Sequence, residues 1–117
     1  MSAHSLITFQ SPAKIAWLTM LTITVLATLN HLILIFVIPE EATLFIGWAA
    51  YTAYAAVVLF IPFRRGETWA WYTTWILAIG FASMGFLDAQ VGMWYSAAGV
   101  IMAGCLMLTR GAFFSKA

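Results

Sequence analysis

Charge is the scarcest property of this sequence. Only 8% of its 117 residues are Asp, Glu, Lys or Arg, whereas a soluble globular domain carries about a quarter. Hydrophobic residues make up 64% of the chain and aromatic residues 16%. So few charges cannot cover the surface of a soluble fold of this size, and the composition excludes a soluble globular protein.

Cysteine and the motifs of soluble enzymes are also missing. Cys105 is the one cysteine, which excludes a disulfide within the chain, and no CxxC or Cys/His pair indicates a zinc site. The sequence has no Gly-rich phosphate loop, no nucleophile beside a histidine and no extended basic patch. It therefore predicts no enzyme, no metal site, no cofactor and no nucleic-acid partner.

What the sequence has instead is four long stretches without Asp, Glu, Lys or Arg. We predict membrane-spanning helices over residues 15–38, 42–62, 68–87 and 91–109. About 20 residues at about 1.5 Å each cross a hydrocarbon core of about 30 Å. Only tight turns remain between the spans. The prediction is a single all-α transmembrane domain over residues 1–117, an integral membrane four-helix up-down-up-down bundle.

The charges fall at the ends of these spans and predict an orientation. Threading the chain back and forth places every basic residue on one side and three of the four acidic residues on the other. The basic residues are Lys14, Arg64, Arg65, Arg110 and Lys116, and the acidic ones opposite them are Glu40, Glu41 and Asp88. By the positive-inside rule both termini are cytoplasmic, and we expect a multi-pass protein of a bacterial inner or plasma membrane.

Small residues form two smooth stripes at helical spacing. One lies in the fourth span and consists of Gly92, Ser96, Gly99 and Ala103; the other lies in the second span and consists of Ala49, Ala53 and Ala56. Helices in lipid associate through small residues because these let the backbones approach closely. The stripes are interpreted either as packing within the bundle or as contacts with another copy or another protein.

His31 is the most prominent candidate for chemistry. It lies within the first span, on one face with Thr24 and Thr28, and we expect a neutral imidazole because desolvation disfavours the charged form. One interpretation is a hydrogen bond to a neighbouring helix, and the other is binding of a ligand or proton. Ala27 would leave room for a macrocycle, but the spans hold no second histidine to act as axial ligand.

Other candidates lie nearer the membrane surfaces. Asp88 with the two glutamates could receive a cation or proton, or could cap and solubilise the turns. Trp71, Tyr72 and Trp75 form an aromatic face that could line a ligand pocket or anchor the third span at the interface. Arg64, Arg65 and Arg110 are predicted to contact lipid headgroups.

The turn between the second and third spans carries a resemblance. Phe63-Arg64-Arg65-Gly66-Glu67-Thr68-Trp69-Ala70-Trp71-Tyr72 resembles a signature of small, functionally uncharacterised bacterial four-helix membrane proteins. The resemblance implies the same architecture and no activity. The size is also similar to that of small multidrug resistance transporters, but those have a glutamate in the first span, where this chain has Thr24, Thr28, Asn30 and His31.

Two functional hypotheses follow. The first is a non-enzymatic membrane protein that serves as an accessory or assembly subunit, or as a self-associating scaffold, with the lipid bilayer and a homo-oligomer or larger membrane complex as its partners. The alternative is a binder or transporter of a lipid, a quinone-like molecule or a cation. It would use His31, Thr24 and Thr28, the aromatic face of the third span and the outer acidic turns.

Overall fold

A computed structural model describes residues 8–87, 90 and 92–114. This part of the chain is helical and contains no strand. The elements are α1 (Ser11–Val37), η1 (Pro39–Glu41), α2 (Ala42–Phe60), α3 (Thr68–Ser83), η2 (Met84–Phe86) and α4 (Gly92–Phe114), where η denotes a short 3-10 helix. The all-α class predicted from the sequence is confirmed for these residues.

Three of the helical segments are long and apolar enough to cross a membrane, namely Ser11–Val37, Pro39–Phe60 and Gly92–Phe114. The third predicted span is shorter in the structure: the α-helix α3 has 16 residues and is followed directly by the 3-10 turn η2. Gly85 lies in that turn, where its N–H donates to Ser96 Oγ of α4 over 2.8 Å. The side-chain bond from α4 replaces the next α-helical bond and ends α3.

The helix ends differ from the predicted limits for physical reasons. α1 begins at Ser11, with a proline in its first two positions, and α4 continues to Phe114, so Lys14 and Arg110 are helical. The predicted limits were set at the first charged residue beside each apolar segment. A helix can continue beyond that point, because a long Lys or Arg side chain on its last turns can reach the headgroup region. α2 ends at Phe60, ahead of the predicted limit, because Pro62 has no N–H to extend the ladder.

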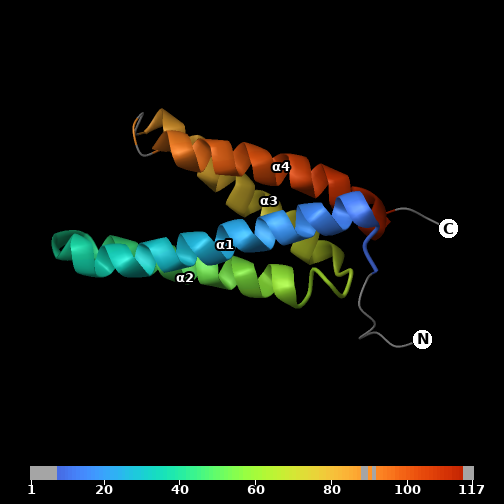
Figure 1. Cartoon of the computed structure of the whole chain (residues 1–117), viewed down its shortest axis with the longest axis horizontal. Helices are drawn as coiled ribbons and strands as arrows, with labels where there is room; N and C mark the ends of the chain where they lie inside the picture. The colour runs from blue at the N-terminus through green and yellow to red at the C-terminus, as the bar shows by residue number, and fades with distance from the viewer. Residues whose placement is uncertain (1–7, 88–89, 91, 115–117) are drawn as a thin grey trace.

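The helices form two pairs that meet at one end of the molecule. α1 packs along α2, α3 packs along α4, and α1 also contacts α4, whereas α2 and α3 touch little. Figure 1 shows the pairs together at the end where the chain termini lie and apart at the opposite end. We call these the closed end and the open end.

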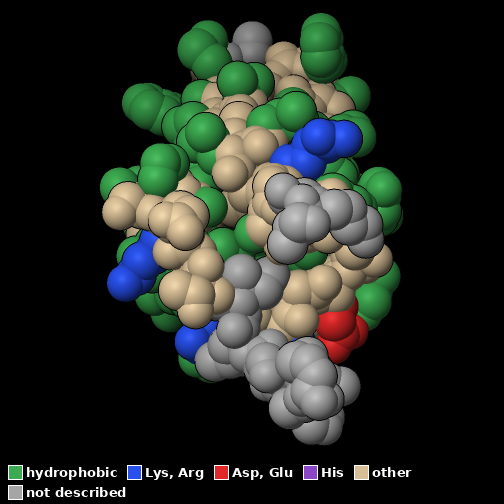
Figure 2. All heavy atoms as spheres, turned by 90° about the vertical axis from the view of Figure 1, so that its right-hand side faces the viewer, with side chains coloured by type: hydrophobic (Ala, Val, Ile, Leu, Met, Phe, Trp, Pro, Cys, Tyr) green, Lys and Arg blue, Asp and Glu red, His purple; other side chains and the backbone are tan. Residues whose placement is uncertain are grey.

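Aromatic rings hold the closed end together. Phe63, from the turn after α2, is fully buried; its ring centroid lies 4.7 Å from that of Phe113 in α4 and 6.1 Å from that of Phe9, which precedes α1. Gly66 lets the chain reverse there, since its φ of 74° lies in the left-handed region. The Arg64 guanidinium lies 5.2 Å from the centre of the Trp17 ring. Figure 2 looks onto this end and shows Lys and Arg side chains on it.

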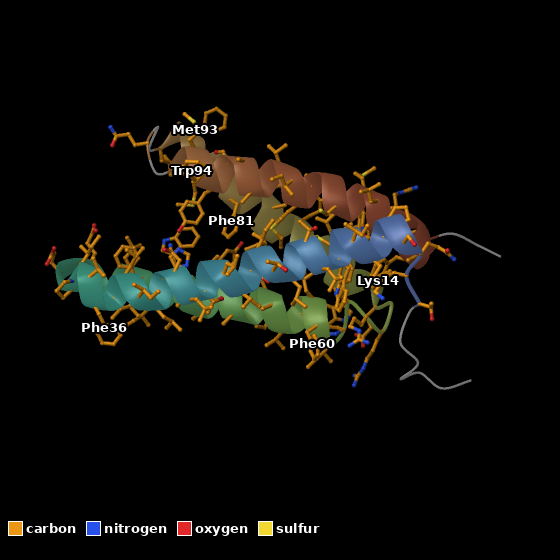
Figure 3. The ribbon with its side chains drawn as sticks, in the orientation of Figure 1. Lys14, Phe36, Phe60, Phe81, Met93 and Trp94 are labelled. Atoms are coloured by element: carbon orange, nitrogen blue, oxygen red, sulfur yellow. The ribbon has the colours of Figure 1, made fainter. Side chains whose placement is uncertain are left out.

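The outside of the helices is apolar. Leu, Ile, Val, Phe or Trp side chains are exposed on every one of the four α-helices, among them Leu26, Phe60, Ile79 and Ile101. Phe36 of α1 is 84% exposed and points away from the other helices in Figure 3. A soluble monomer rarely exposes so continuous an apolar surface, and such a surface is consistent with a membrane protein.

Candidate functional site

His31 lies in a stack of aromatic rings between the two helix pairs. It is 2% exposed. The centroid of its ring is 5.8 Å from that of Tyr95 in α4, with 9° between the ring planes, and 5.9 Å from that of Trp48 in α2. Phe45 lies 6.4 Å away on α2. Three rings from two helices therefore fix the plane of the imidazole.

The polar contacts of His31 are incomplete. Its Nε2 lies 2.8 Å from Tyr95 Oη, and Asn30 Nδ2 donates to the same oxygen over 3.4 Å. The other ring nitrogen, Nδ1, is buried and has no hydrogen-bond partner within the described part of the chain. A buried polar atom left unpaired costs about 1–3 kcal/mol, so its persistence calls for an explanation.

An apolar groove lies beside this pair, between α1 and α4. Its volume is about 590 Å³, and Tyr95, Asn30 and Ala27 are among the residues that line it. The rest of the lining is Ile23, Leu26, Leu34, Phe81, Trp94 and Ala98. Figure 3 labels two of these residues, Phe81 on α3 and Trp94 on α4, near the open end. Trp94 is 80% exposed, so the mouth of the groove faces the surroundings of the helices.

A second groove lies between α2 and α3, on the other side of the histidine stack. It measures about 440 Å³ and is lined by Thr43, Leu44, Gly47, Trp48, Tyr51 and Gly80. Trp48 therefore borders this groove and stacks on His31, while Tyr95 borders the first groove and contacts the same imidazole. The histidine lies between the two openings that the diverging helix pairs create.

The threonines on the same face of α1 as His31 form hydrogen bonds within the protein. Thr24 is fully buried and donates to the Leu21 carbonyl over 2.9 Å. Thr28 Oγ1 lies 2.8 Å from the Thr24 carbonyl and 2.8 Å from Thr52 Oγ1 of α2. The Thr28 hydroxyl thus joins α1 to α2, whereas that of Thr24 bonds within α1, and neither threonine is among the residues that line the groove.

The aromatic face of α3 lies elsewhere. Trp71 donates through Nε1 to the Leu106 carbonyl of α4 over 3.0 Å, and Trp75 and the exposed Tyr72 pack edge-on against its ring. Leu106 is eleven residues beyond Tyr95 on α4, which is about 16 Å along the helix. The structure does not bring His31 together with this aromatic face, which lies toward the closed end.

None of the charged candidates among the described residues lines the groove. Glu40 and Glu41 are exposed in η1 at the open end, and Asp88 lies outside the described residues. Arg64 covers the rings of Trp17 and Phe60, Arg110 lies 5.9 Å from the Phe114 ring, and Arg65 is exposed. No group of three potential metal ligands occurs among the described residues.

The small-residue stripe of α4 faces α3. A Cβ on Gly99 would lie 2.6 Å from the Ala78 carbonyl oxygen, and a Cβ on Gly92 would meet the backbone of Met84. Ser96 Oγ donates to the Ala82 carbonyl over 2.6 Å, and Ala103 is half-buried. In α2, Ala49 is buried and Ala53 and Ala56 are half-buried. The α4 stripe thus serves a contact within the chain.

Sequence reasoning did not single out Tyr95 as a partner of His31, nor Thr52 as a partner of Thr28. Tyr95 lies 64 positions from His31 in the chain. One signal was available: Asn30 and His31 are adjacent polar residues in an apolar span, and such residues need partners on a facing helix.

Comparison of the chain with protein-family models, curated proteins and solved structures gave no match.

Proposed function

We propose that the chain is an integral membrane four-helix bundle of up-down-up-down topology that holds a small apolar molecule in the groove between α1 and α4. In this proposal it binds without catalysing a reaction. Its location is a bacterial inner or plasma membrane, with both termini in the cytoplasm.

The membrane part of the proposal is supported by the apolar exterior and by charge. Lys14, Arg64, Arg65 and Arg110 all belong to helix ends or turns at the closed end, which the positive-inside rule assigns to the cytoplasm. The shorter third helix is also long enough to cross the hydrocarbon core, because the 16 residues of α3 and the 3 of η2 together extend about 30 Å.

The observation that carries the binding role is a groove of about 590 Å³ lined by Tyr95, whose phenol contacts the buried His31, an imidazole whose Nδ1 has no partner among the described residues. Ligand sites are typically apolar cavities of about 300–1,000 Å³ with a few polar groups that orient the ligand. An ionisable residue inside a membrane span is also a functional candidate, because such residues are costly to bury in lipid. The groove lining contains no acidic, basic or thiol side chain, which favours binding over acid–base or covalent chemistry.

Extraction in native lipid discs followed by mass spectrometry tests this role. We expect one small molecule to remain bound at a stoichiometric level. Ala98 lines the groove, whereas its neighbour Ala97 is exposed, so Ala98→Phe should displace the molecule and Ala97→Phe should not. Equal retention by both variants, or no retained molecule in the wild type, would contradict the proposal.

A second candidate role, as a subunit or self-associating scaffold, is favoured by the outer face of α4. Ala97, Gly104 and Gly111 are exposed and recur every seven residues, and nothing lies within 4 Å of a Cβ built on either glycine. Such a face would let another helix approach closely. In crosslinking within membranes, Gly104→Ile should abolish a dimer or complex and Tyr54→Phe, on exposed α2 surface, should not. A wild-type chain that remains uncrosslinked would exclude this role.

A further inference from the structure

The contact between His31 and Tyr95 leaves one proton unused. A neutral imidazole carries one N–H and a phenol carries one O–H, and the contact of 2.8 Å between Nε2 and Oη needs only one of these protons. If Tyr95 donates to Nε2, the imidazole proton is on Nδ1, which has no partner. If Nε2–H donates to Tyr95, the phenol proton has no acceptor. Either tautomer therefore leaves a donor without an acceptor.

The nearest other polar group does not remove this surplus. The side-chain amide of Asn30 lies 3.4 Å from Tyr95 Oη, which is longer than a good hydrogen bond, so it satisfies the pair poorly whichever way the amide is turned. A buried unpaired N–H or O–H is costly in apolar surroundings. Tyr95 lines the α1/α4 groove, so an acceptor placed in the groove would lie where the phenol can donate to it.

We propose, on the basis of the binding role above, that the groove takes a neutral, lipid-soluble carbonyl compound of the quinone class, whose carbonyl oxygen accepts the O–H of Tyr95 while His31 Nε2–H donates to Tyr95 Oη. The lining of Leu26, Leu34, Phe81 and Trp94 fits a ring or an aliphatic tail. A charged headgroup would have no counter-ion there, because none of the lining residues is charged. The exposed Leu26 and Trp94 place the mouth toward lipid, so the ligand enters from the bilayer.

The test compares two probes that differ in the carbonyl groups. Full-length protein in lipid nanodiscs is titrated by calorimetry with decylbenzoquinone and with decylbenzene, which has a similar tail and ring but no oxygen. One hydrogen bond in this setting should make the quinone bind about five- to tenfold more tightly. Tyr95→Phe should bring the two affinities together, and Tyr51→Phe, which removes a phenol from the α2/α3 groove, should leave the preference intact.

Each outcome separates the two proposals. Saturable binding of both probes with equal affinity by the wild type would overturn the carbonyl inference and leave the groove as an apolar site. Saturable binding of neither probe would overturn both the inference and the binding role. A preference that survives in Tyr95→Phe would also overturn the inference. The comparison on wild-type protein is decisive even if the variant fails to fold.

Discussion

The indole nitrogen of Trp17 donates a hydrogen bond of 2.8 Å to the carbonyl oxygen of Leu59, and so joins the beginning of α1 to the end of α2. Leu59 needs this donor because its helical partners are missing. Pro62 has no N–H, and the N–H of Phe63 donates to Val58 instead. The bond thereby completes the backbone hydrogen bonding of α2 at the closed end.

Trp17→Phe should therefore destabilise the fold by about 1–3 kcal/mol, because it leaves the Leu59 carbonyl buried without a donor. Reversible unfolding in mixed micelles measures the change. Trp94→Phe is the control, since Trp94 is 80% exposed, and it should change stability little. Equal losses in the two variants would show that ring volume, and not the indole N–H, is what matters.

Gly99→Ala should separate α3 from α4. The new methyl group would lie 2.6 Å from the Ala78 carbonyl oxygen and 2.9 Å from the Ala82 Cα, so the backbones must move apart, at a cost of about 1–3 kcal/mol. Gly104→Ala meets nothing within 4 Å and should stabilise slightly through its better helix propensity. Unfolding midpoints of the two variants in the same detergent provide the comparison, and a midpoint for Gly99→Ala at or above wild type would contradict the tight contact.

Ser96→Ala should loosen the end of α3. The hydroxyl accepts from Gly85 N–H and donates to the Ala82 carbonyl, so its removal leaves two backbone groups unpaired. We expect faster amide exchange at Gly85 in hydrogen-exchange mass spectrometry. Ser83→Ala, which removes an exposed bond to the Gly80 carbonyl, should leave the Gly85 rate near wild type. Unchanged exchange in Ser96→Ala would mean that the 3-10 turn is held by other contacts.

His31→Phe and Tyr95→Phe should be non-additive. Tyr95→Phe alone leaves Nε2 without a partner, whereas the double variant removes both polar groups and keeps the rings. A double-mutant cycle should give a coupling of about 0.6 kcal/mol and up to about 1.7 kcal/mol, the range for hydrogen bonds between membrane helices. Pairing His31→Phe with Tyr72→Phe, which is exposed on α3, should be additive. Zero coupling for the first pair is the result that would refute the bond.

Cysteine labelling tests the proposed orientation. In intact cells a membrane-impermeant maleimide should modify Glu40→Cys but should modify Arg65→Cys only after permeabilisation, because the two residues lie at opposite ends. Cys105 is buried and should remain unlabelled, so the wild type serves as background. The opposite labelling pattern would reverse the orientation.

Much of the fold was predictable because lipid imposes simple rules on sequence. Apolar length and the positions of the charged turns predicted four helical segments close to those observed, although the second was predicted to run through Pro62 and ends at Phe60. The divergence of the two helix pairs was not predictable. It depends on contacts between residues distant in sequence, such as that of Phe63 with Phe113, which hold the two pairs together at the closed end only.

The candidate site was predictable only in part. His31 was identifiable because an ionisable residue in an apolar span is rare. Its partner was not, since several tyrosines and tryptophans lie near the outer ends of the spans, and the choice of Tyr95 depends on how α4 is rotated about its axis. The same rotation directs the stripe of Gly92, Ser96 and Gly99 toward α3.

The closed and open ends have a mechanical consequence. In a bilayer, a molecule whose helix pairs spread toward one end occupies more area in one leaflet than in the other. Lateral tension acts on that difference in area, and lipids next to the wider end must bend or tilt to fill the grooves. If the chain spans a bilayer as proposed, we expect a molecule of this shape to favour a leaflet curvature that accommodates its wider end, and we expect filling of the α1/α4 groove to change that preference.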